Sequence, residues 1–208
     1  MYKKNIKRFL DIVLSALLLV LLSPLMLITA ILVKLTSRGT VIFRQERIGK
    51  NANVFMMYKF RTMKENSEHT GSGVYSGKGD SRVSGLGKVL RATSIDELPQ
   101  LLNILKGDMS FIGPRPPLTY HPWTIDRYTE EQLRMFEVRP GISGWAQVKG
   151  RKCVEWNERI RMNVWYVDHV TFGLDIKIVL LTIVKVFSNA DNKNVGATVS
   201  TPQNSTGR

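Results

Sequence analysis

The clearest pattern along this 208-residue chain is an uncharged run from Ile12 to Val33 near its N-terminus. The run spans 22 residues, and its apolar character is interrupted only by Ser15, Ser23, Pro24 and Thr29. As a helix it would be about 33 Å long, close to the hydrocarbon thickness of a bilayer. The pattern therefore predicts a membrane-inserted segment. A cleaved signal peptide is the competing interpretation, but the run is long for one and no small-residue cleavage site follows it.

Charge and proline both bear on how this segment lies in the membrane. Basic residues flank it on both sides, with Lys3, Lys4, Lys7 and Arg8 before it and Lys34 and Arg38 after it. Because positively charged flanks stay on the cytoplasmic side, both ends are expected there. Pro24 lacks a backbone donor and predicts a kink, and the hydroxyl of Ser23 could satisfy a carbonyl that the kink frees. A re-entrant hairpin follows, although a kinked spanning helix fits the same residues.

Beyond residue 38 the pattern is that of an α+β domain that is mainly helical. Segments 41–49 and 53–63 are rich in β-branched and aromatic residues and predict a small β-hairpin. Residues 64–85 are dense in Gly and Ser and predict a long surface loop, whereas 130–138 and 154–170 have helical composition. The apolar segment 174–187 is too short to span, so it predicts a helix that is buried or lies in the membrane surface.

These changes in pattern divide the chain into three parts. Residues 1–38 form the membrane anchor, and residues 39–188 form the folded domain. The tail, residues 189–208, is polar and rich in small residues, so we expect it to be disordered.

Composition narrows the class of partner. The formal charge is +13 and the pI is about 10.0, which indicates nucleic acid, phospholipid headgroups or a phosphorylated metabolite. A nucleic-acid-binding protein would leave the long apolar N-terminus unexplained, whereas a non-enzymatic membrane adaptor that binds anionic lipid stays open as an alternative. The three histidines are widely spaced, which argues against a zinc site, and the single cysteine, Cys153, excludes an internal disulfide.

Two adjacent acids, Asp96 and Glu97, stand at the start of "SIDELPQLLNILKGDMSFIGPRP" (94–116). "SIDE" matches a capping box, with Ser94 as the N-cap residue and Glu97 three residues on, which would give the acids a purely structural role. Pro99 disturbs this interpretation, because it would then be the fifth helical residue and would remove a ladder hydrogen bond. A helix that starts one or two residues later would release Glu97 from capping.

Basic residues near these acids indicate a phosphate. Arg91 precedes them, and Arg115 lies between prolines that hold its backbone extended. Lys59 alternates outward on the strand expected at 53–63, where it is either a solvated edge charge or a residue of the site. A carboxylate beside such groups can bind Mg²⁺ or attack phosphorus itself.

Together with "FRQERIG" (43–49), "YKFRTM" (58–63) and "RPGISGWAQVKGR" (139–151), this stretch resembles the bacterial sugar transferase family, the small monotopic phosphoglycosyl transferases, over roughly residues 5–188. The resemblance implies an enzyme on the cytoplasmic face of the bacterial inner membrane, held by a re-entrant helix broken at Ser23-Pro24. It implies transfer of a sugar 1-phosphate from a UDP-sugar to polyprenyl (undecaprenyl) phosphate, with release of UMP, in a surface glycan pathway.

At the matching positions the resemblance implies that Asp96 is the nucleophile and Glu97 its acidic partner, with Mg²⁺ bound at the pair. It implies phosphate contacts for Arg91 and Arg139, and a nucleotide site at the turn formed by Gly113, Pro114, Arg115 and Pro116. The sugar, the pathway and the carboxylate that touches the metal stay open. The helix expected at 174–187 also leaves a homodimer open.

Overall fold

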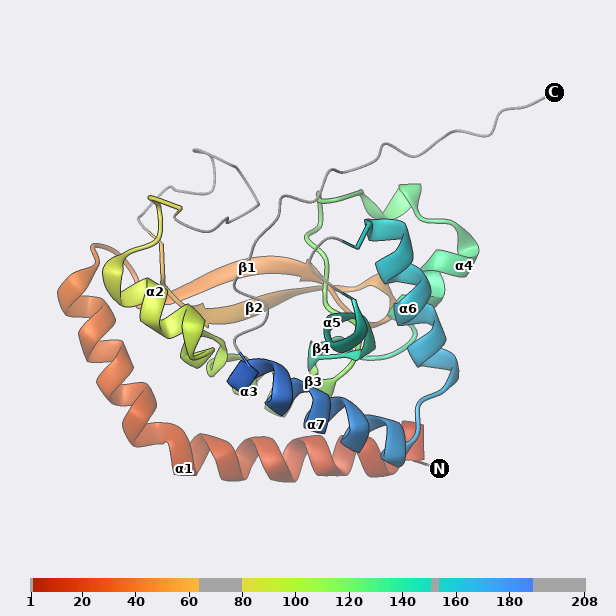
Figure 1. Ribbon diagram of the computed structural model, residues 1–208, viewed down its shortest axis with the longest axis horizontal. Helices are drawn as coiled ribbons and strands as arrows, with labels where there is room; N and C mark the ends of the chain where they lie inside the picture. The colour runs from red at the N-terminus through yellow and green to blue at the C-terminus, as the bar shows by residue number, and fades with distance from the viewer. Residues whose placement is uncertain (1, 64–79, 151–153, 189–208) are drawn as a thin grey trace.

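The computed structural model describes residues 2–63, 80–150 and 154–188 (Figure 1). The α-helices and the strands are α1 (Lys7–Thr36), β1 (Ile42–Ile48), β2 (Val54–Phe60), α2 (Gly85–Ala92), α3 (Gln100–Lys106), β3 (Ser110–Ile112), α4 (Glu130–Leu133), β4 (Gly141–Ser143), α5 (Trp145–Lys149), α6 (Trp156–Asp168) and α7 (Phe172–Ser188). In addition, η1 (Tyr2–Ile6) is a π-helix, and η2 (Lys50–Ala52), η4 (Ile95–Glu97), η5 (Ile125–Arg127) and η6 (Arg134–Phe136) are 3-10 helices. This part of the chain is mainly helical with little sheet, as predicted. Most of the predicted loop 64–85 and the whole predicted tail 189–208 lie outside the described residues.

The predicted hairpin is confirmed. β1 and β2 pair antiparallel, from Ile42 opposite Phe60 to Ile48 opposite Val54. Because side chains alternate along a strand, positions 43, 45 and 47 of β1 share a face with positions 55, 57 and 59 of β2. This face carries Lys59, so the register decides which other side chains lie beside it.

β3 and β4 form a second, parallel pair. The pair continues past the strand ends, since the Gly113 amide donates to the Ser143 carbonyl at 2.9 Å and the Gly141 amide donates to the Pro114 carbonyl at 2.9 Å. A Cβ atom on Gly113 would lie 2.3 Å from the Arg139 carbonyl oxygen, so only glycine permits this close approach. The two strands thereby bring the segments around residues 115 and 140 together.

Helix α1 bends in the middle, and Figure 1 shows two arms that meet at an angle. The helix contains Pro24, which has no amide hydrogen to give to the Val20 carbonyl one turn earlier. The Ser23 hydroxyl donates to that carbonyl at 2.8 Å, as the sequence suggested. The Ser23-Pro24 pair therefore accounts for the bend and for the partner of the Val20 carbonyl.

Both arms of α1 pack against the same domain. In the first arm, Leu18, Leu19 and Leu22 pack onto a core that joins β2 to α3. In the second arm, Val33 is buried with Phe60 of β2 and Leu90 of α2. The opposite side of α1 is apolar and exposed, and the helix is long and apolar enough to cross a membrane.

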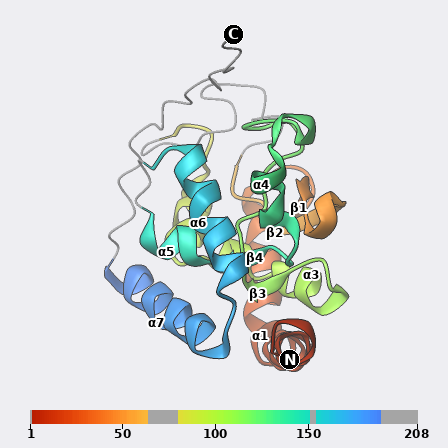
Figure 2. The same cartoon turned by 90° about the vertical axis from the view of Figure 1, so that its right-hand side faces the viewer.

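Helix α7 buries one face against the domain and exposes the other. Ile178 is buried, whereas the outward residues Leu180 and Val184 are 58% and 62% exposed. Asp175 in its first turn accepts hydrogen bonds from Tyr2 at 2.6 Å and Lys7 at 2.5 Å, which tie α7 to the start of α1. Figure 2 shows both helices along one side of the domain. Their exposed residues give this side an apolar surface.

A buried acid links α1 to β3. Asp11 is 5% exposed, and its Oδ1 accepts from the Ser110 hydroxyl and from the Phe111 amide, both at 3.1 Å. Asp11→Ala leaves both donors without an acceptor, so we expect it to lower the free energy of unfolding by about 1–3 kcal/mol. Asp11→Asn keeps one acceptor oxygen and should lose less. Thermal unfolding in detergent measures both variants, and an equal loss from the two would contradict this role.

Candidate functional site

The two acids lie on a short turn between α2 and α3, not in a helix cap. Ser94 adopts a left-handed backbone conformation with φ 58°, and its side chain makes no capping hydrogen bond. Asp96 and Glu97 belong to η4, and α3 begins only at Gln100, directly after Pro99. The capping-box interpretation is therefore wrong. Pro99 precedes the first helical residue, where its missing amide hydrogen breaks no helical bond.

Asp96 is held in a buried, charged environment. Its residue is 7% exposed, and Lys59, Glu97 and Arg91 are the charges that act on it. The pKa of Asp96 is raised to about 6, because burial, with a contribution from Glu97, outweighs the lowering effects of Lys59 and Arg91. At neutral pH most of this carboxyl is ionised, yet it is more basic than an ordinary aspartate. Such a carboxylate is suited to act as a nucleophile.

The pKa of Glu97 shifts in the opposite direction from that of Asp96. Its Oε1 accepts a hydrogen bond from the Lys59 ammonium group at 2.7 Å, which forms an ion pair between η4 and β2. Burial by itself would raise the pKa of Glu97, but the charges of Lys59 and Arg115 outweigh it and hold the pKa below its ordinary value. Adjacent carboxyls whose pKa values move apart are typical of acids with different roles in one site.

Arg91 is a second positive charge that acts on Asp96. It is half-buried at the end of α2, and its Nε donates to the Thr62 hydroxyl at 2.8 Å. An arginine held in this way beside a carboxylate can meet the oxygens of a phosphoryl group that the carboxylate attacks.

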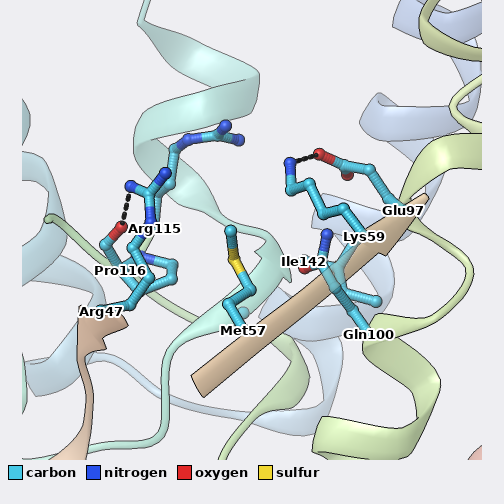
Figure 3. Close-up of a pocket in the computed structure, with 9 residues that line it drawn as sticks. Arg47, Met57, Lys59, Glu97, Gln100, Arg115, Pro116 and Ile142 are labelled. Atoms are coloured by element: carbon cyan, nitrogen blue, oxygen red, sulfur yellow. Dashed lines mark hydrogen bonds and ion pairs between the residues drawn. The ribbon is translucent and has the colours of Figure 1, made fainter. Parts of the chain in front are cut away.

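A pocket opens beside the acids (Figure 3). Lys59, Glu97 and Gln100 stand on one side of it, Arg47, Arg115 and Pro116 stand on the other, and Met57 lies between them. Gly141 and Ile142 complete the lining.

The predicted residues are thus partly brought together. Lys59, Glu97, Arg115 and Pro116 line the pocket, and Asp96 lies next to Glu97 in the chain, within reach of the charges of Lys59 and Arg91. Gly113 and Pro114 support the turn through their bonds to β4. Arg139 is not among the residues that line the pocket: its Nε donates to the Gly107 carbonyl at 2.7 Å, at the C-terminal end of α3. Its phosphate contact stays a prediction, and this arrangement gives it a structural task.

Arg47 and Gln100 line the pocket but were missed from the sequence. The sequence did hold a signal for Arg47. Arg47 lies two residues after Gln45 on β1, just as Lys59 lies two residues after Met57 on β2, and residues two apart on a strand share a face. Gln100 had none, since its position depends on where α3 begins.

Asp96 and Glu97 could supply some, but not all, of the ligands of a magnesium ion. Among the described residues, no group of three or more His, Cys, Asp or Glu side chains could form a metal site. Asp96 and Glu97 offer two adjacent carboxylates, and Glu97 already binds Lys59. Mg²⁺ is commonly held by one or two carboxylates together with substrate phosphate oxygens. The residues therefore fit an ion that arrives with a phosphorylated substrate.

The chain thus combines a long apolar helix with a domain whose paired carboxylates lie among lysine and arginine side chains, an arrangement typical of proteins that handle phosphate groups. The chain belongs to the bacterial sugar transferase family, whose model matches residues 2–189. The resemblance found in the sequence is thereby confirmed, and the chain is a transferase.

The names of similar proteins agree with this family. The chain is 42% identical over 181 residues to the uncharacterized sugar transferase EpsL of Bacillus subtilis, and the match covers 87% of each. It is 45% identical to the UDP-N-acetylgalactosamine-undecaprenyl-phosphate N-acetylgalactosaminephosphotransferase of Aeromonas hydrophila, over 86% of this chain and 43% of that protein. It is 43% identical to a UDP-glucose:undecaprenyl-phosphate glucose-1-phosphate transferase of Caulobacter vibrioides, over 85% of this chain and 68% of that protein.

The raised pKa of Asp96 predicts that Asp96→Asn stabilises the fold at neutral pH. A carboxyl with a higher pKa in the folded chain binds its proton more tightly there, so its ionisation disfavours the folded state above pH 3.8, increasingly up to about pH 6. Without added metal, the gain at pH 7 should be at most about 3 kcal/mol and should vanish toward pH 4. Thermal unfolding across this range measures it. A variant that is less stable than the natural chain at pH 7 would contradict the account.

Proposed function

We propose that this chain transfers a sugar 1-phosphate from a UDP-sugar to undecaprenyl phosphate through a covalent intermediate on Asp96. The observation that carries the proposal is the buried carboxylate of Asp96, which has no capping role and is flanked by Lys59 and Arg91. The names of the Aeromonas and Caulobacter relatives support the same donor and acceptor classes.

In the first step, a carboxylate oxygen of Asp96 attacks the β-phosphorus of the UDP-sugar. A bond forms between that oxygen and phosphorus, the bond from phosphorus to the bridging oxygen breaks, and UMP leaves with the electron pair. Lys59 and Arg91 stabilise the negative charge on the transferring phosphoryl group. Glu97 holds the Lys59 ammonium in position through the 2.7 Å ion pair.

In the second step, an oxygen of undecaprenyl phosphate attacks the same phosphorus. The bond to Asp96 breaks and the carboxylate returns to its starting state, so one phosphoanhydride has replaced another. The product is undecaprenyl diphosphate sugar, the substrate for later steps of a surface glycan pathway. Because UMP leaves before the lipid enters, the kinetics should be ping-pong.

Magnesium belongs to this proposal as a cofactor. Asp96 and Glu97 are the residues that would hold it, together with oxygens of the donor. When bound, Mg²⁺ neutralises charge on the diphosphate.

The bend in α1 supports a re-entrant anchor, and the basic residues on both of its flanks support its placement on the cytoplasmic face of the inner membrane. A straight helix of 30 residues would be about 45 Å long and would carry its ends to opposite sides of a bilayer. Here Asp11 in the first arm and Val33 in the second both contact the same domain. With both ends held there, the exposed apolar residues near the bend are the part that enters lipid. The homodimer considered from the sequence stays a prediction.

The direct test of function is UMP release. Purified protein with Mg²⁺ is offered a panel of UDP-sugars that includes UDP-N-acetylgalactosamine and UDP-glucose, with and without undecaprenyl phosphate. We expect one donor to give sustained UMP release that needs the lipid, and at most one equivalent without it. Asp96→Asn and chelation of the metal should each remove it. A membrane adaptor or a nucleic-acid-binding protein would release no UMP with any donor.

The re-entrant anchor predicts that both flanks of α1 face the cytoplasm. Cysteines are introduced singly as Asn5→Cys and Arg38→Cys in a Cys153→Ser background; the residues at 5 and 38 are exposed. A membrane-impermeant maleimide should label both in inverted inner-membrane vesicles and neither in intact spheroplasts. Labelling of the two positions from opposite sides would establish a spanning helix instead.

A further inference from the structure

Arg47 forms part of the pocket wall that faces the Lys59–Glu97 pair (Figure 3). It lies near the end of β1, on the hairpin face that also carries Met57 and Lys59. The hairpin therefore contributes a cation to each side of the pocket. The steps proposed above assign a role to Lys59 and none to Arg47.

Arg115 lies between two backbone points that are fixed from outside its turn. On one side, the Pro114 carbonyl accepts the Gly141 amide at 2.9 Å. On the other, the Pro116 carbonyl accepts Nη1 of Arg47 at 3.1 Å. Positions 114, 116 and 117 of this turn are prolines, which restrict φ and have no amide hydrogen. These three residues therefore cannot donate backbone hydrogen bonds that would hold the turn. Its conformation depends on donors supplied by β4 and β1.

Arg47 is suited to this task because its guanidinium group is itself oriented. Nη2 donates to Oε1 of Gln45 at 2.7 Å, while Nη1 reaches the Pro116 carbonyl. The next residue of β1, Ile48, donates its amide to the Pro117 carbonyl at 3.0 Å. A planar fork can bind two acceptors in fixed directions at once, whereas a lysine ammonium group is a point charge on a flexible stem. The end of β1 thus clamps two successive carbonyls of the turn.

We propose that Arg47 is a positioning residue that holds Arg115 ready to bind the phosphate group opposite Asp96. This inference rests on the proposed function. In an in-line displacement, the leaving oxygen departs on the side opposite the attacking carboxylate. The acceptor must then attack from that same side to displace Asp96. Arg115 stands across the pocket from the Lys59–Glu97 pair, so it meets the phosphate of UMP first and the phosphate of the lipid afterwards.

The test measures binding of phosphate groups separately from the chemical step. Arg47→Ala and Arg47→Lys are compared with Arg44→Ala, a matched control on the same strand. Arg44 is exposed, lies on the other hairpin face and stacks over Tyr58 at 6.0 Å. We expect Arg47→Ala and Arg47→Lys to raise both the UMP inhibition constant and the KM for undecaprenyl phosphate by about tenfold, with a smaller fall in kcat. Arg44→Ala should leave all three within about twofold.

A double-mutant cycle with Arg115 shows whether Arg47 acts through it. In an Arg115→Ala background, Arg47→Ala should change the UMP inhibition constant by less than about twofold, because the group it positions is gone. Far-UV circular dichroism and melting temperature establish that each variant is folded, and Arg47→Lys retains the charge should the alanine variant unfold.

The outcomes separate this proposal from the function on which it rests. If the natural chain releases no UMP and is not inhibited by it, the proposed function fails. If the natural chain is active but both Arg47 variants are inhibited by UMP as strongly as it is, the positioning role fails. Additive effects of the Arg47 and Arg115 substitutions would also overturn it, because they would mean that the two side chains act independently.

Discussion

The ion pair between Lys59 and Glu97 is the interaction on which the rest of the site depends. Two carboxylates on adjacent residues repel each other, and burial adds to the cost of their charges. Lys59 lies 2.7 Å from Glu97 and also acts on Asp96, so it allows Glu97 to stay ionised while the pKa of Asp96 rises only to about 6. The pair therefore gives one acid a fixed structural charge and leaves the other basic enough to react.

The fold assembles the remaining charges from distant parts of the chain. β2 supplies Lys59, α2 supplies Arg91, and the turn after β3 supplies Arg115. The first arm of α1 packs beneath β2 and α3, and the second arm packs beneath β2 and α2. Helix α1, which we propose enters the membrane, is thus also part of the core under the site. In the proposed function, this shared packing keeps the pocket close to the element that enters lipid, where a soluble nucleotide and a lipid phosphate can both reach it.

The features that depend only on residues close together in the chain were predicted from the sequence. The hairpin followed from β-branched and aromatic runs, and the bend followed from Ser23-Pro24, whose hydroxyl satisfies a neighbouring carbonyl. Pro99 correctly indicated that α3 begins late, whereas the capping box failed because the chain reverses at Ser94 in a left-handed conformation that no four-residue motif specifies. The contacts of Arg139 and Arg47 with Gly107 and Pro116 could not be predicted from the sequence, since they depend on packing between segments far apart.

The central claim is that Asp96 bonds covalently to phosphorus. Active protein is incubated with Mg²⁺ and its UDP-sugar donor in the absence of lipid, quenched in acid and digested, and the peptide that contains Asp96 is analysed by mass spectrometry. The account predicts a mass increase of one sugar phosphate on that side chain, which disappears when undecaprenyl phosphate is added before the quench. Protein that releases UMP but never carries the adduct on Asp96, or carries it on another residue, would contradict the account.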